Sequence, residues 1–265
     1  MYSEPEVLAL AREEKDYHSF EREIDNWRMR RKDANDRKVV DEVFDRRNLM
    51  RLYKMFSDGV LSRLDFPIAT GKEGNVFRAT TADGGFVAVK IYRTTTATFK
   101  DMAKYVQGDP RFKGITTNRR RLILAWAAKE YSNLRRLTDA GVRVPKPIAH
   151  YQNIVVMEYI GDEVEPAREM RDVPLDDPEN VARKILAYIR LAYQKANLVH
   201  GDVSEFNVLM VGQEPILIDV GQAVMLEHPL AEELLERDVA NVARYFRKYR
   251  IDIDPKTELE VIRKP

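Results

Sequence analysis

The sequence of 265 residues contains no cysteine and only four histidines, which narrows the metal chemistry open to it. Without cysteine, disulfides and thiolate metal sites are excluded, and four scattered histidines disfavour a structural zinc site. Any bound metal is therefore expected to have oxygen ligands.

Long apolar runs are also missing. No stretch reaches the roughly 18 to 20 apolar residues that a membrane-spanning helix needs. The first residues are acidic and amphipathic, whereas a secretory signal has a basic start followed by an apolar block. We therefore expect a cytoplasmic protein without a membrane segment. A net charge of +1 gives no general reason to expect nucleic-acid binding, and 44% hydrophobic residues suffice for a real core.

The hydrophobic pattern divides the chain into three parts. Residues 1–64 are densely charged with helical spacing and predict a helical extension. Residues 65–160 contain short β-like runs and predict a small sheet with one long helix, which forms the first lobe. Residues 161–265 are mostly helical and predict a second lobe. The fold class expected from this order is α+β.

A polar segment at 93–118 interrupts the first lobe. It carries Gly108, Pro110 and Gly114 and shows little sustained periodicity, so it predicts a long, partly mobile loop. An Ala- and Leu-rich helix follows and ends at Gly141, as expected of a glycine stop. A proline-containing connection and a buried strand at 154–157 complete this lobe.

The strand "FVAVKIY" places Ala88 and Lys90 on one face, because side chains alternate along a strand. A small residue beside a lysine leaves room for a flat ligand and supplies a cation for its phosphates. A lysine that protects a sheet edge from aggregation would give the same pattern. Upstream, "TGKEGNVF" puts Gly71 and Gly74 in a turn, where bare backbone can approach a phosphate. An ordinary turn also fits, because the spacing matches neither the P-loop nor the glycine-rich loop of kinases.

Glu130 lies on the same helical face as Leu134 and Leu137, at the margin of a buried surface. A carboxylate there requires a cation, and Lys90 is the candidate. The alternative is a solvated glutamate beside Lys129.

The stretch from His200 to Val224, "HGDVSEFNVLMVGQEPILIDVGQAV", carries the most specific signal. Asn207 follows Asp202 by five residues, and Asp219 follows Asn207 by twelve, in an Asp-x-Gly that closes a hairpin. This order matches the catalytic and metal loops of protein-kinase-like phosphotransferases. Asp202 suits the orientation of a nucleophile, and Asn207 and Asp219 suit Mg²⁺. The structural alternative is that Asp202 and Asn207 only cap a loop and that Asp219 only ends a strand. Because Lys90 and Glu130 also occur in the order expected of a kinase, the motifs together predict a metal-bound nucleoside triphosphate as the ligand.

These motifs resemble those of the RIO family of atypical serine protein kinases and ATPases, in the short, archaeal-like form of its Rio one branch. The resemblance rests on "ATGKEGNVF", "FKDMAKYVQGDPRF", "WAAKEYSNLRRL", "VVMEYIG" and "LIDVGQAV". The N-terminal region is similar to the helical region of that branch and does not resemble the winged helix of the Rio two branch. The resemblance implies a bilobal protein-kinase-like fold with a small β-rich N-lobe, a reduced helical C-lobe and an N-terminal helical extension.

The resemblance also implies a role for each matching residue. Lys90 would pair with Glu130, Met157 would guard the back of the adenine pocket, and the backbones of Glu158 and Ile160 would bind the adenine edge. The cofactors implied are ATP and Mg²⁺, with Mn²⁺ as an alternative metal. The expected catalytic residues are Asp202, Ser204, Asn207 and Asp219, of which Asn207 and Asp219 are the metal ligands. The expected ATP-binding residues are Thr70, Gly71, Lys72, Glu73, Gly74, Asn75, Val76, Ala88, Lys90, Glu130, Met157, Glu158 and Ile160.

Several positions depart from the usual patterns. Ser204 stands where other kinases use a lysine, and Ala69 and Gly74 replace the family's serine and alanine, which predicts a looser phosphate loop. His-Gly-Asp and Asp-Val-Gly replace H-R-D and D-F-G, and no A-P-E occurs. Too few residues follow Asp219 for an activation segment and peptide-binding helices. The resemblance therefore implies autophosphorylation or ATPase activity, including a phospho-aspartate at Asp219, and a pre-small-subunit ribosomal particle as partner.

Two other functions are compatible with the motifs. A small-molecule kinase of the aminoglycoside or choline kinase type shares H-G-D-x-x-x-x-N, but it needs a larger helical lobe, and "TGKEGN" and "IDVGQAV" favour RIO. A nucleotide-gated assembly module would bind pre-ribosomal RNA or protein, with Arg119, Arg120 and Arg121 touching RNA phosphates. The sequence leaves the oligomeric state open.

Overall fold

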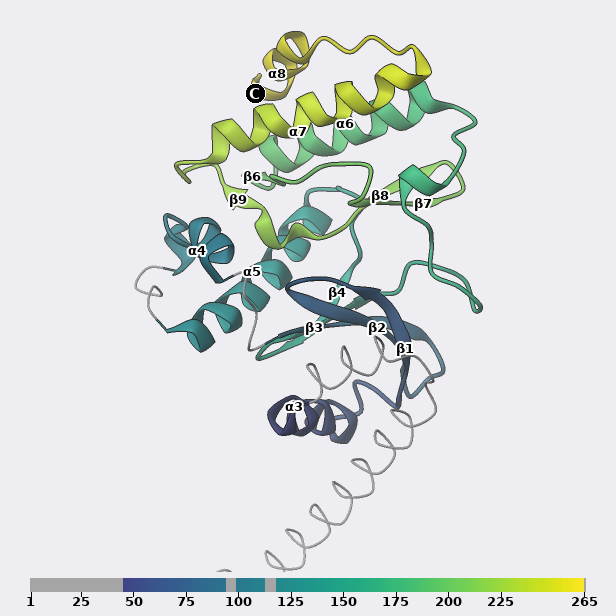
Figure 1. Cartoon of the computed structure of the whole chain (residues 1–265), viewed down its shortest axis with the longest axis vertical. Coiled ribbons are helices and arrows are strands. Elements are labelled where there is room, and N and C mark those ends of the chain that lie inside the picture. Colours follow the sequence, from purple (N-terminus) through teal and green to yellow (C-terminus); the bar gives the residue numbers. More distant parts are fainter. Residues whose placement is uncertain (1–44, 94–98, 113–117, 265) are drawn as a thin grey trace, which may run out of the picture.

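The structure is a computed structural model that describes residues 45–93, 99–112 and 118–264. A five-stranded sheet with α3 on one side forms one lobe, and α6, α7 and α8 dominate the other (Figure 1). The α+β, two-lobed architecture is thus confirmed. Within the described ranges, no helix combines the length and apolar character that a membrane crossing requires.

The elements of the first lobe, through the strand that leads into the second, are α3 (Arg46–Ser57), β1 (Arg63–Thr70), β2 (Gly74–Thr80), β3 (Phe86–Tyr92), α4 (Phe99–Val106), η1 (Pro110–Phe112), α5 (Arg119–Asp139), β4 (Pro147–Tyr151) and β5 (Ile154–Glu158). Those of the second lobe are η2 (Met170–Asp172), α6 (Pro178–Gln194), β6 (Leu198–Val199), β7 (Val208–Val211), β8 (Glu214–Leu217), η3 (Val220–Gln222), β9 (Val224–Met225), α7 (Ala231–Phe246), η4 (Arg247–Tyr249) and α8 (Pro255–Arg263).

The large sheet has the order β1-β2-β3-β5-β4, and every neighbouring pair is antiparallel. In this register Val76 of β2 lies opposite Lys90 of β3, and Ala88 lies opposite Met157 of β5. The turn before β2 and the end of β5 therefore flank the face that carries Lys90.

Helix α3 covers the other face of the sheet. Leu49, Leu52 and Met55 pack there with Phe77, Val89 and further strand residues in one buried cluster. Each fully buried side chain of this kind contributes about 1.5 to 3 kcal/mol. The N-terminus of the helix is capped by Asp45, whose carboxylate accepts a hydrogen bond from the Asn48 amide at 2.8 Å.

Buried polar groups fix α3 in place. Asn153 donates to Asn48 Oδ1 at 3.0 Å and to the Tyr92 carbonyl at 2.6 Å, and Arg51 donates to the carboxamide oxygens of Asn48 and Asn153. Because buried donors are costly to leave unpaired, these bonds specify one position of the helix on the sheet.

A second core joins the lobes. Ala88, Val155 and Met157 from the sheet share one buried cluster with α5, α6 and α7, whose members include Trp126, Ile185 and Leu235. The alternation predicted for β3 is confirmed, because Ala88 belongs to this core whereas the alternating residues Val87, Val89 and Ile91 belong to the cluster on the α3 side.

Two sequence predictions need correction, and one helix was not anticipated. The segment 93–118 is not one long loop, because it contains α4 and η1; Met102, Tyr105 and Val106 are buried at helical spacing, a signal too short to stand out. Its parts at 94–98 and 113–117 lie outside the described residues. The proline-containing connection includes a strand, β4, and the C-terminal helix α8 was not anticipated. Helix α3 lies within the predicted helical extension, and residues 1–44 lie outside the described part. The division of the chain at residues 64 and 160 stays a prediction.

Candidate active site

The phosphate-loop candidate is a tight turn between β1 and β2. The Gly71 amide donates to the Gly74 carbonyl at 2.9 Å, and Thr70, Gly71 and Lys72 are exposed. A Cβ at Gly74 would lie 2.3 Å from the Ile91 carbonyl oxygen, so only glycine fits the observed backbone. The prediction of a loose loop at Gly74 therefore misses that β3 presses on this position.

Two residues of this turn are directed away from solvent. The Asn75 carboxamide accepts a hydrogen bond from Arg93 at 3.0 Å on the α3 side of the sheet, away from the face that carries Lys90. Glu73 is half-buried, and burial together with the charge of Asp219 raises the pKa of its carboxyl to about 7. Asn75 thus supports the turn, whereas Glu73 faces the group of charges beneath it.

Lys90 lies at the centre of these charges. Its Nζ donates to Glu130 Oε1 at 2.7 Å and to Asp219 Oδ1 at 2.9 Å, which brings together three residues predicted from separate motifs. Burial alone would lower the pKa of Lys90, but Asp219 and Glu130 outweigh it and raise it well above its ordinary value. The Tyr92 hydroxyl also bonds Glu130, a contact that the sequence did not reveal. The lysine therefore stays charged where phosphates would bind.

Asp202 and Asn207 contact each other within the loop at residues 200–207, which is called the catalytic loop below. Asn207 Nδ2 donates to the backbone oxygen and to Oδ2 of Asp202, both at 2.9 Å, and Gln222 donates to the same Oδ2 at 3.2 Å. Burial, followed by the charge of Asp219, raises the pKa of the Asp202 carboxyl. Lys90 instead lowers the pKa of Asp219. Ser204 is half-buried in the same loop, and its carbonyl accepts from the Asn207 amide at 3.0 Å.

Helix α7 fixes the catalytic loop through hydrogen bonds to its backbone. Asp238, fully buried, accepts hydrogen bonds from the amides of Gly201 at 2.7 Å and Val203 at 2.8 Å, and Asn241 donates to the Val203 carbonyl at 3.0 Å. Sequence reasoning missed both residues. Their signal was a carboxylate and a carboxamide three residues apart on the apolar face of a helix.

His200 starts the catalytic loop as a neutral imidazole. Its Nδ1 accepts from the Asp202 amide at 3.3 Å, so the proton on Nε2 points to the Ile218 carbonyl at 3.2 Å. Burial lowers the pKa of His200 to about 4, because the charged imidazolium would lose its solvation.

The His200 pKa predicts an acid-sensitive contribution to stability. This contribution is complete above pH 6.5, the ordinary pKa, and is lost as the pH falls towards 4, by about 3 kcal/mol in total. His200→Gln keeps a donor and an acceptor but does not titrate. Between pH 8 and pH 4 we expect the wild type to lose about 3 kcal/mol of unfolding free energy relative to His200→Gln in denaturant titrations, because only the wild type titrates; parallel curves would contradict the assignment.

The end of β5 leads into the segment that connects the lobes. Met157 is buried, and the Glu158 carboxylate forms a bidentate pair with Arg143 at 2.7 and 2.8 Å. The Glu158 amide donates to the Lys146 carbonyl, and the Ile160 carbonyl accepts from the Ala167 amide. If these backbones bind adenine, they therefore do so with the carbonyl of Glu158 and the N–H of Ile160.

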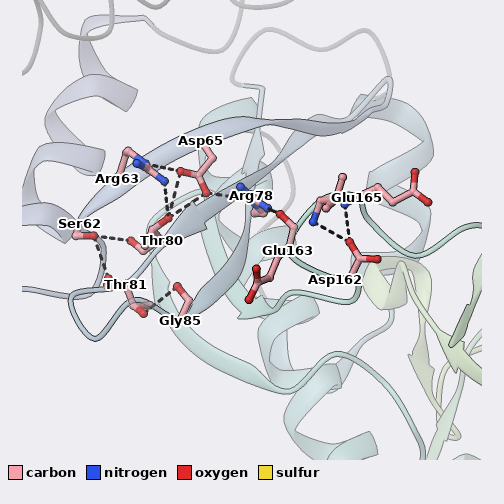
Figure 2. A network of polar contacts seen from close by, with 11 residues as sticks. Ser62, Arg63, Asp65, Arg78, Thr80, Thr81, Gly85, Asp162, Glu163 and Glu165 are labelled. Carbon is pink, nitrogen blue, oxygen red and sulfur yellow. Dashed lines mark hydrogen bonds and ion pairs between the residues drawn. The ribbon is translucent and has the colours of Figure 1, made fainter.

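Arg78 ties this connecting segment to the sheet (Figure 2). Its guanidinium lies between the rings of Phe66 and Phe86, 4.4 and 4.3 Å from their centroids. It donates to Asp65 Oδ2 at 3.0 Å and to the Glu163 carbonyl at 2.7 Å. The position of the connecting segment thus depends on a side chain of β2.

Arg78→Met should cost about 2 to 4 kcal/mol of stability, because the Asp65 side chain, 4% exposed, loses a buried partner. Arg63→Met is the matched control, since Arg63 contacts the same carboxylate but its side chain is 62% exposed; it should cost under about 1 kcal/mol. Equal losses in thermal unfolding would contradict this account.

Comparison with known proteins places this geometry in a family. Residues 75–259 match the model of the RIO domain. The chain is 43% identical over 242 residues to the RIO-type serine/threonine-protein kinase Rio1 of Haloferax volcanii, covering 91% of this chain and 83% of the relative. The chain belongs to the RIO family. This RIO chain is also 38% identical over 257 residues to Rio1 of Methanocaldococcus jannaschii, covering 97% and 85% of the two chains. Its predicted membership is thereby confirmed, and so is its place among phosphotransferases.

Two further comparisons agree. The human serine/threonine-protein kinase RIO1 is 39% identical over 245 residues, which cover 91% of this RIO chain and 43% of the human protein. A solved structure of the Rio2 kinase-ADP/Mg²⁺-phosphoaspartate complex from Chaetomium thermophilum has a TM-score of 0.63 at 23% identity, covering 82% of this chain and 67% of that one. The kinase-like fold is therefore confirmed.

Proposed function

We propose that the protein is an ATP- and Mg²⁺-dependent RIO kinase that transfers the γ-phosphoryl group to itself, to a protein substrate or to water. One observation carries the proposal: Lys90 contacts both Glu130 and Asp219, next to a catalytic loop in which Asn207 holds Asp202. Positioning and charge stabilisation account for most of phosphoryl-transfer catalysis, and these residues supply both.

The donor atoms fit Mg²⁺. Asn207 donates to Asp202 through Nδ2, which leaves its Oδ1 available for a metal. Asp219 accepts from Lys90 through Oδ1, which leaves its Oδ2 available. Mg²⁺ is commonly held by one or two carboxylates together with substrate phosphates and water. Mn²⁺ prefers the same ligands and is an acceptable substitute.

The surroundings also fit ATP. Val76, Ala88 and Met157 offer apolar surface for an adenine ring beside the connecting segment. The Glu158 carbonyl and the Ile160 N–H match the donor and acceptor on the adenine edge. Gly71 and Gly74 allow backbone amides to approach the phosphates, and Lys90 neutralises their charge.

The two aspartates are suited to different tasks because their surroundings separate their pKa values. Asp202, with its raised pKa, would orient the attacking hydroxyl or water and accept its proton. Asp219, with its lowered pKa, would stay ionised and hold the metal. Bound Mg²⁺ would neutralise charge on the β- and γ-phosphates.

The acceptor and the cellular role are carried by family resemblance alone. The resemblance supports autophosphorylation, ATP hydrolysis and a phospho-aspartate at Asp219. It also supports a cytoplasmic role in maturation of the small ribosomal subunit, with the pre-small-subunit particle as partner. RNA contact by the arginines at 119–121, which are exposed at the start of α5, is supported by their charge and not by the resemblance.

The proposal is tested by incubating the purified protein with Mg²⁺ and γ-labelled ATP, with α-labelled ATP as the control. Label on the protein from the γ-position only is expected, together with released phosphate. Label that hydroxylamine removes identifies an aspartyl phosphate, whereas stable label identifies serine or threonine. Absence of both label and hydrolysis would overturn the proposal.

A further inference from the structure

Four side chains on one face of α5 are directed towards the site. Trp126, Lys129, Glu130 and Asn133 follow the spacing of a single helical face, and each is at most 1% exposed. Glu130 binds Lys90, as described above. Lys129, which the sequence analysis named only as the neighbour of Glu130, is completely buried.

Lys129 and Asn133 contact the turn that follows Asp219. Lys129 Nζ donates to the Gly221 carbonyl at 2.7 Å and also to the Ala223 carbonyl. Asn133 Nδ2 donates to the carbonyls of Val220 at 2.8 Å and Ala223 at 3.0 Å. Three backbone carbonyls of η3 and its end are thus held by two side chains of α5.

The turn has a reason to need this support. Asp219 has φ 58° and ψ 58°, a left-handed conformation that is unfavourable for a residue other than glycine. Such a conformation persists only where the surroundings over-determine it. Gly221 also packs against α5, because a Cβ there would lie 3.0 Å from Trp126 Nε1.

The Asn133 carboxamide is itself oriented from the other side. Arg111 of η1 donates to Asn133 Oδ1 at 2.9 Å, which leaves the amide nitrogen for the turn. Arg111 is held by Asp109 through bonds of 2.9 and 2.6 Å. The segment between α4 and α5 thus contributes to the position of the turn.

Lys129 is a completely buried amine that binds backbone carbonyls. Its Nζ donates to carbonyl oxygens and lies 5.3 Å from the centroid of the Trp126 ring. Burial, followed by the charge of Arg111, lowers the pKa of Lys129 to about 7. An amine and an ammonium both donate N–H bonds, so the contact to the turn does not depend on the charge. A leucine or methionine would fill the same space without the free-energy cost of burying an amine, which indicates that the N–H donors of Lys129 are needed.

We propose that Lys129 and Asn133 are positioning residues for phosphoryl transfer, which hold the turn after Asp219 so that its carboxylate faces Lys90 and the metal. This inference rests on the proposed function. It makes α5 the common support of the site, since the same helix face fixes Lys90 through Glu130 and Asp219 through the turn. Outer contacts of this kind change metal affinity by about 10- to 100-fold when they are removed.

The test uses Lys129→Met, Asn133→Leu and Arg111→Gln in the full-length protein. Arg136→Gln is the matched control, because Arg136 also lies on α5 and donates to a carbonyl of the second lobe, that of Ala196, but not to the turn. Two quantities are measured: ADP affinity in EDTA, and the Mg²⁺ concentration that gives half-maximal ATP turnover. Hydrogen exchange of residues 217–226 without nucleotide reports on the turn directly.

We expect Lys129→Met and Asn133→Leu to raise the Mg²⁺ requirement at least about 10-fold and to accelerate exchange in the turn, with ADP affinity in EDTA within about 2-fold. Arg111→Gln should also raise the Mg²⁺ requirement and accelerate exchange in the turn, but by less. This variant provides the test if the two buried variants do not fold. Arg136→Gln should match the wild type.

Wild-type Mg²⁺ dependence in the folded variants would overturn the positioning role, as would an equal loss of ADP affinity in EDTA. A wild-type protein that shows no Mg²⁺-dependent ATP binding would instead overturn the proposed function on which the inference rests.

Discussion

Asp202→Asn should reduce phosphoryl transfer by about 10²- to 10⁴-fold, the usual contribution of a positioned general base. The asparagine oxygen can still accept the hydrogen bonds that Asn207 and Gln222 donate to Asp202 Oδ2. The loop should therefore keep its shape while losing a carboxylate whose pKa is raised for proton transfer. Nucleotide affinity should stay within a few-fold, because Asp202 is not expected to bind the metal.

Single-turnover kinetics with labelled ATP and calorimetric titration of nucleotide separate these two effects. Glu205→Gln in the same loop is the control, since it removes a carboxylate without touching the proposed machinery and should leave the rate unchanged. Unaltered turnover in Asp202→Asn would show that another group receives the proton.

Asp219→Asn should lower Mg²⁺-dependent ATP affinity by about 100-fold or more, because the metal loses its only carboxylate ligand in the proposed site. The variant also removes the anion that Lys90 contacts at 2.9 Å. ADP binding in EDTA should change little or improve slightly, since a negative charge near the phosphates is gone.

Calorimetry with and without Mg²⁺ measures the metal-dependent part of the affinity directly. Asp252→Asn is a suitable control, because Asp252 is an exposed carboxylate in the connection before α8. Should Asp219→Asn retain the full Mg²⁺-dependent gain in ATP affinity, the metal must bind elsewhere.

The pairing of Lys90 with Glu130 could be predicted because each position follows from a local rule. Strand alternation fixed the face of Lys90, helical periodicity fixed that of Glu130, and the kinase-like order of motifs brought the two faces together. Asp202, Asn207 and Asp219 were found in the same way, since their spacing reflects a loop and a hairpin that are close in sequence.

The supports of the site could not be predicted, because they depend on contacts distant in sequence. Asp238 binds the catalytic loop at a sequence separation of 37 residues, and Lys129 binds the turn after Asp219 at a separation of 92. In the sequence, each is a polar residue within an amphipathic helix, and burial alone distinguishes it from a solvated one. Tyr92 was missed for a related reason: an aromatic residue at a strand end predicts packing, whereas its hydroxyl binds Glu130.

The most direct test of the central claim is a crystal structure of the protein with Mg²⁺ and a non-hydrolysable ATP analogue. The account predicts the adenine at the Glu158 carbonyl and Ile160 N–H, and a metal about 2.0 to 2.1 Å from Asn207 Oδ1 and an Asp219 carboxylate oxygen. A metal distant from both residues, or a nucleotide bound away from Lys90, would contradict it.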